Sequence, residues 1–320
     1  MNLKTLIARI PGVKPAYSLL TQRRRAAAER RALGPIDEIP VEQSMIDEVK
    51  MLFANNRHSR KPVVDPSGEL VLSTTTHGVR LKTVHLAIES VARGTRLPRR
   101  MILWLDDPAA ARRLPRTLKR LQDRGLEIVQ VPPGWKVHTK YFGFAKSGTD
   151  DGSALATCDD DIIYPPTWLE NLEARHREYP DSIVCYRAHV VGLTDDGIAQ
   201  YQTWRACESA APSLLHLSTS VSGQVLPAVL LDVARQAGEA FRSVAPNNDD
   251  VWLHHLAVSA DIRTVQVTED PMLFPFVPGS QATGLHLSNV WNNENDTQIN
   301  ATYSTSDVEK MRAELGQLSS

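Results

Sequence analysis

The stretch Ala154-Leu155-Ala156-Thr157-Cys158-Asp159-Asp160-Asp161 is a short apolar run that ends in three consecutive carboxylates. Gly152 precedes the run and Pro165-Pro166 follows it, so the run has the length and the boundaries of a buried strand. Such a strand places the three aspartates at its carboxyl end. Adjacent anions repel each other, which favours a bound cation, and carboxylate oxygens are the ligands that Mg²⁺ and Mn²⁺ prefer. The alternative is a solvated acidic turn.

The composition of the chain is that of a soluble globular protein, and 320 residues suffice for one large α/β domain or two smaller ones. A formal net charge of -1 argues against nucleic acid as the main partner. The cysteines Cys158, Cys185 and Cys207 lack metal-type spacing and are odd in number, which favours a reducing cytoplasm over a disulfide framework. No apolar run approaches the ~20 residues that span a bilayer, and the N-terminus lacks a signal-peptide pattern. We therefore expect a cytoplasmic protein.

The first 34 residues form a basic arm. Leu3, Leu6, Ile7 and Ile10 fall on one helical face, and eight basic residues face only Glu29: Lys4, Arg9, Lys14, Arg23, Arg24, Arg25, Arg30 and Arg31. A basic amphipathic helix of this kind can lie on an anionic membrane surface. The alternative is a helix that packs on the protein itself or at an oligomer interface.

From residue 69 to residue 161, predicted strands alternate with predicted helices. The strands are expected at residues 70–75, 101–105, 126–131 and 153–158, with helices near residues 81–91, 115–121 and 139–146 between them. This order predicts an α/β fold with a mostly parallel sheet and crossover helices. Ligands bind outside the carboxyl ends of such strands.

The four predicted strand ends are turn-like, and three of them carry polar side chains. They are residues 74–78, Asp106-Asp107, residues 132–135 and Asp159–Asp161. Polar groups that recur at the same edge of a sheet indicate a site rather than a chance acidic turn.

The second half of the chain gives a more mixed pattern. We expect a helix that Pro165-Pro166 opens and that runs through Trp168, Leu169 and Leu172. After it we expect one strand over residues 182–191, a helix over 229–237, a polar loop that enters a helix near Asp249-Asp250, a strand over 261–268, a polar segment over 279–302 and a helix over 306–318. Asp at a helix start is an ordinary cap, but two adjacent carboxylates exceed what one cap needs.

Four motifs together resemble the nucleotide-sugar-dependent glycosyltransferases of the GT-A type, above all the family 2-like bacterial enzymes that build cell-surface polysaccharides. The motifs are residues 73–80 (STTTHGVR), Thr139-Lys140, residues 159–165 (DDDIIYP) and residues 247–252 (NNDDVW). The resemblance covers residues 69–290. It implies a GT-A (Rossmann-like) mixed sheet, mostly parallel and flanked by helices. The predicted domains are a basic helical extension over 1–62, a GT-A domain over 63–303 with nucleotide-binding half 69–161 and acceptor half 162–303, and a C-terminal helix over 304–320.

The resemblance also implies roles for residues around the nucleotide sugar. A Mn²⁺ or Mg²⁺ ion would be held by Asp161, Asp159 and His286, and the nucleotide sugar by Thr74, Arg80, Asp106, Lys140, Asp159 and Asp160. A divalent ion is required there because departure of the nucleoside diphosphate builds negative charge. The alternatives are that Arg80 and Lys140 are solvated surface cations and that His286 is structural.

On the acceptor side the resemblance implies a general base. Asp250, or else Asp249, would take the proton of the acceptor hydroxyl. Trp252 would stack on an acceptor sugar, unless it belongs to the core. Gly223 would belong to a glycine-bearing acceptor loop, although Gln224 stands where a second glycine is common.

The predicted activity is therefore the transfer of a hexose from a nucleoside-diphosphate sugar, with UDP as the favoured nucleotide, to a glycan or glycolipid. The predicted reaction depends on a metal and inverts the anomeric centre. The alternatives are a sugar nucleotidyltransferase and a catalytically silent scaffold that binds nucleotides or glycans.

Overall fold

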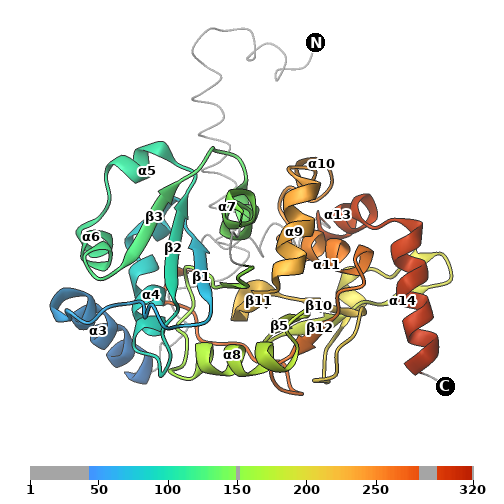
Figure 1. Ribbon diagram of the computed structural model, residues 1–320, viewed down its shortest axis with the longest axis horizontal. Helices are drawn as coiled ribbons and strands as arrows, with labels where there is room; N and C mark the ends of the chain where they lie inside the picture. Colours follow the sequence, from blue (N-terminus) through green and yellow to red (C-terminus); the bar gives the residue numbers. More distant parts are fainter. Residues whose placement is uncertain (1–42, 149–151, 281–293, 319–320) are drawn as a thin grey trace, which may run out of the picture. The chain divides into compact units, whose positions relative to one another are not determined.

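The computed structural model describes residues 43–148, 152–280 and 294–318, of which residues 47–280 and 294–318 belong to one compact unit. Its centre is a seven-stranded sheet with the order β12-β5-β11-β4-β1-β2-β3 (Figure 1). The four strands of the first half form at the predicted apolar runs: β1 (Val71–Thr75), β2 (Arg100–Leu105), β3 (Leu126–Gln130) and β4 (Leu155–Thr157). β1 pairs in parallel with β2 and β4, and β2 pairs in parallel with β3. The predicted mixed, mostly parallel sheet is confirmed.

Helices cover both faces of this sheet because the strands are apolar on both sides. One face packs against α4 (Val84–Ala92), α6 (Arg116–Gln122) and α8 (Trp168–Glu178). The other face packs against α7 (Thr139–Ser147), α9 (Ala228–Ala237) and α11 (Asp249–Ser259). Successive residues of one strand point to opposite faces of the sheet: Leu72 packs on the face covered by α4, α6 and α8, and Val71 packs on the face covered by α7, α9 and α11.

The strand that we expected over residues 182–191 is wrong as a single element. The chain forms β5 (Ile183–Cys185), leaves the large sheet at Tyr186-Arg187, and continues as β6 (Ala188–Val190). β6 belongs to a separate three-stranded sheet with β10 (His216–Ser218) and β9 (Arg205–Ala206). Because the chain changes sheet here, Arg187 lies outside the core and lines a neighbouring cavity.

β11 (Gln224–Leu226) joins the two halves of the large sheet. It runs antiparallel between β4 and β5, and β5 in turn pairs in parallel with β12 (Thr264–Gln266). β11 was not predicted, because Gln224–Leu226 begins with a polar residue and directly follows a Gly- and Ser-containing segment, so no bounded apolar run marks it in the sequence. Through β11, the first and second halves share one continuous set of backbone hydrogen bonds.

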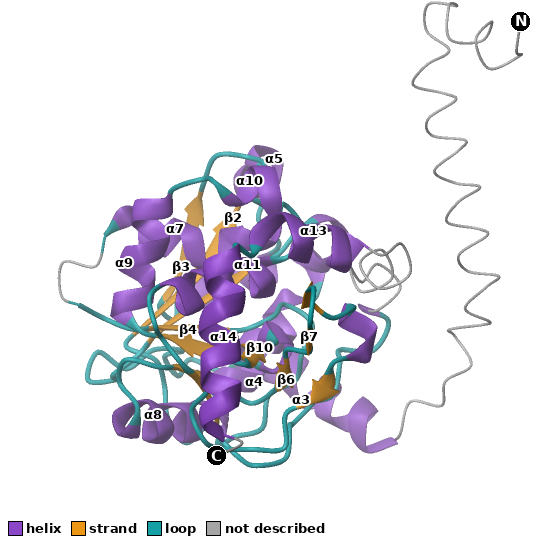
Figure 2. Cartoon of the chain, turned by 90° about the vertical axis from the view of Figure 1, so that its right-hand side faces the viewer, coloured by secondary structure: helices purple, strands orange, loops and turns teal. Residues whose placement is uncertain are grey.

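The remaining elements surround this core. They are α3 (Gln43–His58), α5 (Pro108–Arg112), α10 (Phe241–Val244), α13 (Glu294–Thr302), α14 (Thr305–Leu318), the hairpin β7 (Leu193–Thr194) and β8 (Gly197–Ile198), and the short 3₁₀ turns η2 (Gly78–Lys82), η3 (Lys136–His138), η4 (Tyr201–Thr203) and η5 (Ser220–Ser222). α13 and α14 pack on α11 (Figure 2). The helix α13 lies in the segment of residues 279–302, for which we expected polar character and no particular element, and it buries Asn295, Gln298 and Ile299.

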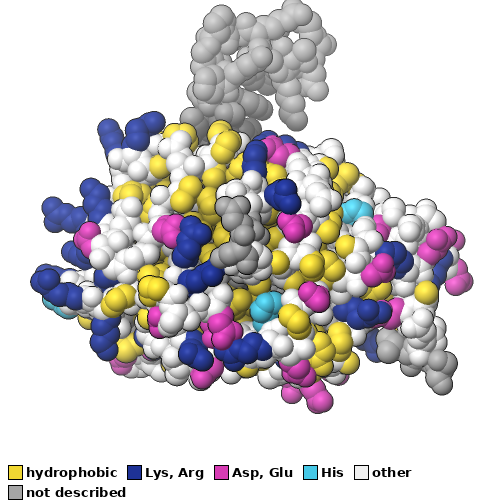
Figure 3. Space-filling model, viewed as in Figure 1, with side chains coloured by type: hydrophobic (Ala, Val, Ile, Leu, Met, Phe, Trp, Pro, Cys, Tyr) yellow, Lys and Arg dark blue, Asp and Glu magenta, His cyan; other side chains and the backbone are white. Residues whose placement is uncertain are grey.

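The surface carries charges of both signs, as the net charge near zero requires. Lys and Arg side chains gather at the edge formed by α3, α5 and α6 (Figure 3). None of the described helices has the length and apolarity that a membrane crossing requires. The basic arm of residues 1–34 lies outside the described residues.

Candidate active site

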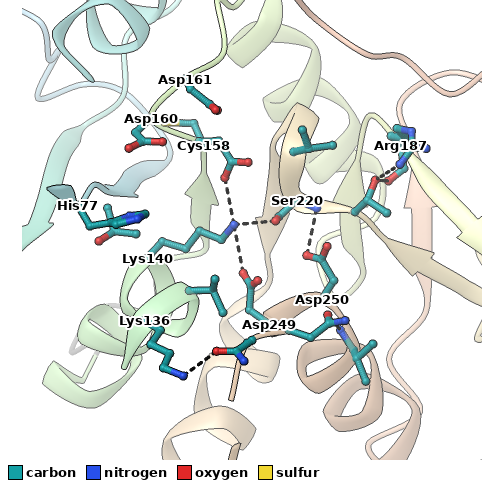
Figure 4. Close-up of a pocket in the computed structure, with 18 of the residues that line it drawn as sticks. His77, Lys136, Lys140, Cys158, Asp160, Asp161, Arg187, Ser220, Asp249 and Asp250 are labelled. Carbon is teal, nitrogen blue, oxygen red and sulfur yellow. Dashed lines mark hydrogen bonds and ion pairs between the residues drawn. The ribbon is translucent and has the colours of Figure 1, made fainter. Parts of the chain in front are cut away.

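A cavity of ≈ 740 Å³ opens at the carboxyl edge of the parallel strands, where the sequence predicts a site. Eight of the predicted site residues line it: Arg80, Asp106, Lys140, Asp159, Asp160, Asp161, Asp249 and Asp250. They come from the ends of β1, β2 and β4, from α7 and from the start of α11, so the fold gathers them from a span of about half the chain. Figure 4 shows Lys140 between Ser220 and Asp249, with Asp160 and Asp161 on one side and Asp250 on the other.

The aspartates that follow β4 are held by two cations. Arg80 donates from Nη1 to Asp160 Oδ1 at 2.9 Å and lies with Nη2 3.1 Å from Asp161 Oδ2. Thr76 donates its hydroxyl to the other oxygen of Asp160 at 2.5 Å. Asp160 is therefore fixed by protein groups alone, whereas Asp159 faces the second cation, Lys140, at 3.1 Å.

Lys140 connects the two acidic motifs of the sequence. Its ammonium lies 3.1 Å from Asp159 Oδ1 and 3.1 Å from Asp249 Oδ2, and it donates to Ser220 Oγ at 2.6 Å. Burial disfavours the charged ammonium, but the nearby carboxylates outweigh it and raise the pKa of Lys140. The side chain is thus a fixed positive charge rather than the solvated surface cation of the alternative interpretation.

The second acidic pair begins α11, but neither member caps the helix. The N-cap is Asn248, whose side-chain oxygen accepts from the Val251 backbone N–H at 3.0 Å. Asp249 and Asp250 stand in the first turn, where the helix dipole favours anions. Asp250 Oδ1 accepts from the Ser220 backbone N–H at 3.1 Å. Both carboxylates are therefore free of the capping role and face the cavity.

Negative charge is in excess in the cavity. Six carboxylates line it, at positions 106, 159, 160, 161, 249 and 250, against the four cations Arg80, Lys136, Lys140 and Arg187. Burial raises the pKa of Asp161 to about 7, with a further contribution from Asp159. Burial and the neighbouring Asp249 likewise raise the pKa of Asp250. With all ten groups ionised, the surplus of two negative charges would match the charge of one divalent cation.

The donor atoms around Asp161 suit a hard metal ion, because the side chains of Asp159 and Asp161 offer only oxygen. Among the described residues, however, no three acidic, histidine or cysteine side chains form a cluster that would hold an ion by themselves. An ion that takes one or two carboxylates and completes its shell with substrate phosphate fits this donor set. His286, the third predicted ligand, lies outside the described residues.

Three predicted site residues do not line the cavity. Thr74 is buried behind Thr75, which lines it instead. Trp252 is 5% exposed and belongs to the core with Phe241, so the predicted stacking on an acceptor sugar is wrong and the core alternative holds. Gly223 is the third, and it is absent from the cavity lining.

Gly223 has a structural role instead of the predicted acceptor contact. Its φ is +91°, and a Cβ atom built there would lie 2.3 Å from the ring of Trp168. The glycine thus allows the turn between η5 and β11 to pass over the indole, whose N–H donates to the Ser222 carbonyl at 2.9 Å. Residues before Gly223, including Ser220 and Val221, line the cavity.

Several lining residues gave no signal in the sequence. Lys136, Arg187, Tyr201, Thr219 and Ser220 are isolated polar or aromatic residues outside the motifs, and only the folded chain brings them to the cavity. Lys136 has a positive φ of 52°, uncommon for a non-glycine residue, and donates to Asn247 Oδ1 at 2.7 Å.

Comparison with known proteins gives one sequence match and several structural matches. Residues 74–221 match the sequence model of the family Glycosyl transferase family 2, and no curated protein matches the chain. The solved structures include a mannosyltransferase, PcManGT from Pyrobaculum calidifontis in complex with GDP-Man and Mn²⁺, at 15% identity and TM-score 0.49, covering 85% of this chain and 77% of that one.

Two further solved structures are similar at lower scores. GalNAc-T7 with UDP, GalNAc and Mn²⁺ has 12% identity and a TM-score of 0.44, with 71% of this chain and 49% of that chain covered. The 4-diphosphocytidyl-2C-methyl-D-erythritol synthase from Anaerococcus prevotii has 12% identity and a TM-score of 0.43, with 72% of this chain and 100% of that chain covered.

Proposed function

We propose that this chain is a family 2-like glycosyltransferase of the GT-A type, as its motifs predict and as the match of residues 74–221 to the sequence model of that family supports. The enzyme transfers a hexose from a nucleoside-diphosphate sugar, with UDP as the favoured nucleotide, to a glycan or glycolipid acceptor. The transfer depends on Mn²⁺ or Mg²⁺ and inverts the anomeric centre.

One observation carries this proposal: two acidic motifs that are far apart in the sequence meet across one cavity. Lys140 lies 3.1 Å from Asp159 of the first motif and 3.1 Å from Asp249 of the second. A transferase needs one acidic group near the leaving diphosphate and another near the attacking hydroxyl. The cavity offers both.

On the donor side, Asp161 and Asp159 would hold the divalent ion, which when bound neutralises the charge of the leaving diphosphate. Arg80 and Lys140 hold the neighbouring aspartates and contribute positive charge to the same region, which favours an anionic leaving group. Asp106, at the carboxyl end of β2, also lines the cavity and would contact the ribose or the base.

On the acceptor side, Asp250 acts as the general base. Its carboxylate takes the proton from the acceptor hydroxyl while the hydroxyl oxygen forms the new bond to the anomeric carbon and the bond to the diphosphate breaks. The burial that raises the pKa of Asp250 makes it a better base than a solvated aspartate. The backbone N–H of Ser220 orients the carboxylate.

The test is release of nucleoside diphosphate from a panel of nucleotide sugars with Mn²⁺ and pooled glycan acceptors, with and without EDTA. We expect Asp161→Ala to lower release by about 100-fold or more, because an interaction with developing charge is lost. The matched control is Asp195→Ala, an exposed aspartate in the β7–β8 turn, which should match the unchanged protein.

Other outcomes separate the alternatives. Full release in Asp161→Ala would contradict the metal site. Pyrophosphate formed from a nucleoside triphosphate and a sugar 1-phosphate would identify a nucleotidyltransferase, and donor binding without turnover on any acceptor would identify a scaffold.

We also place the enzyme at the inner face of a membrane. This placement rests on the basic arm of residues 1–34, whose cations would each contribute on the order of 1 kcal/mol near an anionic surface.

A further inference from the structure

The four cations that line the cavity differ in how they are neutralised. Arg80 and Lys140 are paired with aspartates at 2.9 to 3.1 Å, and Lys136 donates to the amide oxygen of Asn247. Arg187 makes no ion pair with any described residue. Its Nη1 donates to the neutral hydroxyl of Thr219 at 3.0 Å, which leaves the rest of the guanidinium to the cavity.

Arg187 is nevertheless held in place. It stands where the chain leaves β5 for β6, and its backbone carbonyl accepts from the Thr219 N–H at 2.9 Å. Thr219 therefore fixes both the main chain and the side chain of Arg187. A cation that is fixed before binding loses little entropy when it takes a ligand.

The position of Arg187 relative to the proposed base identifies which substrate it meets. Thr219 precedes Ser220, whose backbone N–H donates to Asp250. Figure 4 shows Arg187 on the far side of Ser220 and Asp250 from Asp160 and Asp161. A molecule that presents a hydroxyl to Asp250 on this side would pass beside the guanidinium, whereas the donor diphosphate belongs with the aspartates of the other side.

The chemistry around Arg187 favours an oxyanion. A guanidinium presents parallel N–H groups that match the two oxygens of a carboxylate or phosphate. The half-buried ring of Tyr201 lines the same part of the cavity and offers an apolar face with a phenol. Burial raises the pKa of Tyr201 to about 12, so its hydroxyl remains a neutral donor.

We propose that Arg187 forms an acceptor subsite for an oxyanion, so that the acceptor glycan carries a carboxylate or a phosphate close to the hydroxyl that is glycosylated. This inference rests on the proposed function, because it is Asp250 as base that makes this side of the cavity the acceptor side.

The experiment measures binding of three matched probes: methyl β-D-glucuronide, methyl β-D-glucoside 6-phosphate and neutral methyl β-D-glucoside. UDP and Mn²⁺ are present in excess so that the donor phosphate site is filled, and dissociation constants come from saturation-transfer NMR. We expect at least one anionic probe to bind about tenfold or more tightly than the neutral one, as one charge-assisted hydrogen bond supplies. Whichever anion is preferred identifies the carboxylate or the phosphate as the ligand.

Variants attribute the preference to this residue. Arg187→Gln should reduce the ratio between anionic and neutral probes to about one, and Arg187→Lys should retain part of it because the charge stays. The matched control is Arg205→Gln, since Arg205 is an exposed arginine of β9 that does not line the cavity. Thermal unfolding checks that each variant is folded.

Three results would overturn the proposal. The first is equal affinity for anionic and neutral probes, including no binding of any probe, and the second is a preference for the anionic probes that survives in Arg187→Gln. The third is an Arg187→Gln variant that binds UDP-glucuronic acid more weakly but UDP-glucose as before, which would assign Arg187 to the donor. A different result would contradict the proposed transfer and leave the oxyanion site standing: no nucleotide sugar releases its nucleotide, while the anionic probes still bind as expected.

Discussion

At the scale of single residues, the structure separates two adjacent acids that the sequence cannot distinguish. Lys140 neutralises Asp249 directly, at 3.1 Å, whereas Asp250 Oδ1 accepts from the Ser220 backbone N–H at 3.1 Å. Burial and the neighbouring Asp249 raise the pKa of Asp250, which makes it a better proton acceptor than a solvated aspartate. Asp249 is better suited to hold Lys140 between the two motifs.

We therefore expect Asp250→Asn to lower the transfer rate by about 10³-fold, the usual contribution of a general base, while donor affinity changes little. Single-turnover kinetics with titration of the donor measure both quantities. Asp249→Asn is the matched variant and should keep more of the chemical step. The reverse order, an inactive Asp249→Asn with an active Asp250→Asn, would exchange the two roles.

At the scale of elements, the turn between η5 and β11 depends on one glycine. Gly223 has φ and ψ of 91° and 149°, and Gly148 after α7 has nearly the same values, 79° and 146°. A Cβ atom at Gly148 would meet nothing within 4 Å, whereas one at Gly223 would lie 2.3 Å from Trp168. The two glycines therefore share the same backbone strain but differ in available space.

We expect Gly223→Ala to lower the free energy of unfolding by about 3 kcal/mol or more, from backbone strain together with overpacking. Gly148→Ala should lower it by about 1 to 2 kcal/mol, from backbone strain alone. Urea denaturation of both variants measures the difference. Equal losses in the two would show that Trp168 moves aside without cost.

The elements also show which parts of the fold and of the site could be predicted from the sequence. Strands β1 to β4 were predictable because each is a bounded apolar run, and the acids of the site were predictable because they follow such a run or begin a helix. β11, by contrast, follows a Gly- and Ser-containing segment without a bounded apolar run, and it owes its position to pairing with β4 and β5. Arg187 lines the cavity because the chain changes sheet after β5, and no local sequence pattern predicts that change.

At the scale of the whole molecule, buried histidines make stability depend on pH. Burial lowers the pKa of His254 to about 4; its Nε2 contacts the Leu214 carbonyl at 2.9 Å and its Nδ1 contacts the Tyr303 hydroxyl at 2.6 Å. The unfolded chain takes up the proton near pH 6.5, so this contribution to stability is present at neutral pH and is lost as the pH falls from 6.5 toward 4. Asp161, whose pKa is raised, acts in the opposite direction.

The contribution of His254 is isolated by comparing how the free energy of unfolding changes with pH in the unchanged protein and in a His254 variant. Between pH 7 and pH 5, we expect the free energy of unfolding of the unchanged protein to fall by about 2 kcal/mol more than that of His254→Gln. Urea denaturation at both pH values measures it. His58→Gln, at an exposed position on α3, is the control and should keep the slope of the unchanged protein. Parallel slopes in all three proteins would contradict the assignment.

Removal of residues 1–34 tests the proposed membrane contact. The truncated protein should bind vesicles that contain phosphatidylserine more weakly than the full chain, and the difference should shrink in high salt, because the contact is electrostatic. Co-sedimentation measures binding, with vesicles of phosphatidylcholine alone as the control. Equal binding by both proteins would leave the arm a structural role only.

The antiparallel insertion of β11 has a consequence for the order in which the chain folds. The parallel neighbour of β4 is β1, which is synthesised before β4. Its other neighbour is β11, which follows much later in the chain. Until β11 is synthesised, β4 is an unpaired edge strand whose three side chains are buried in the final fold, and such an edge can pair with other chains. Nascent or truncated chains that end before residue 224 would therefore carry the first acidic motif and an aggregation-prone edge together.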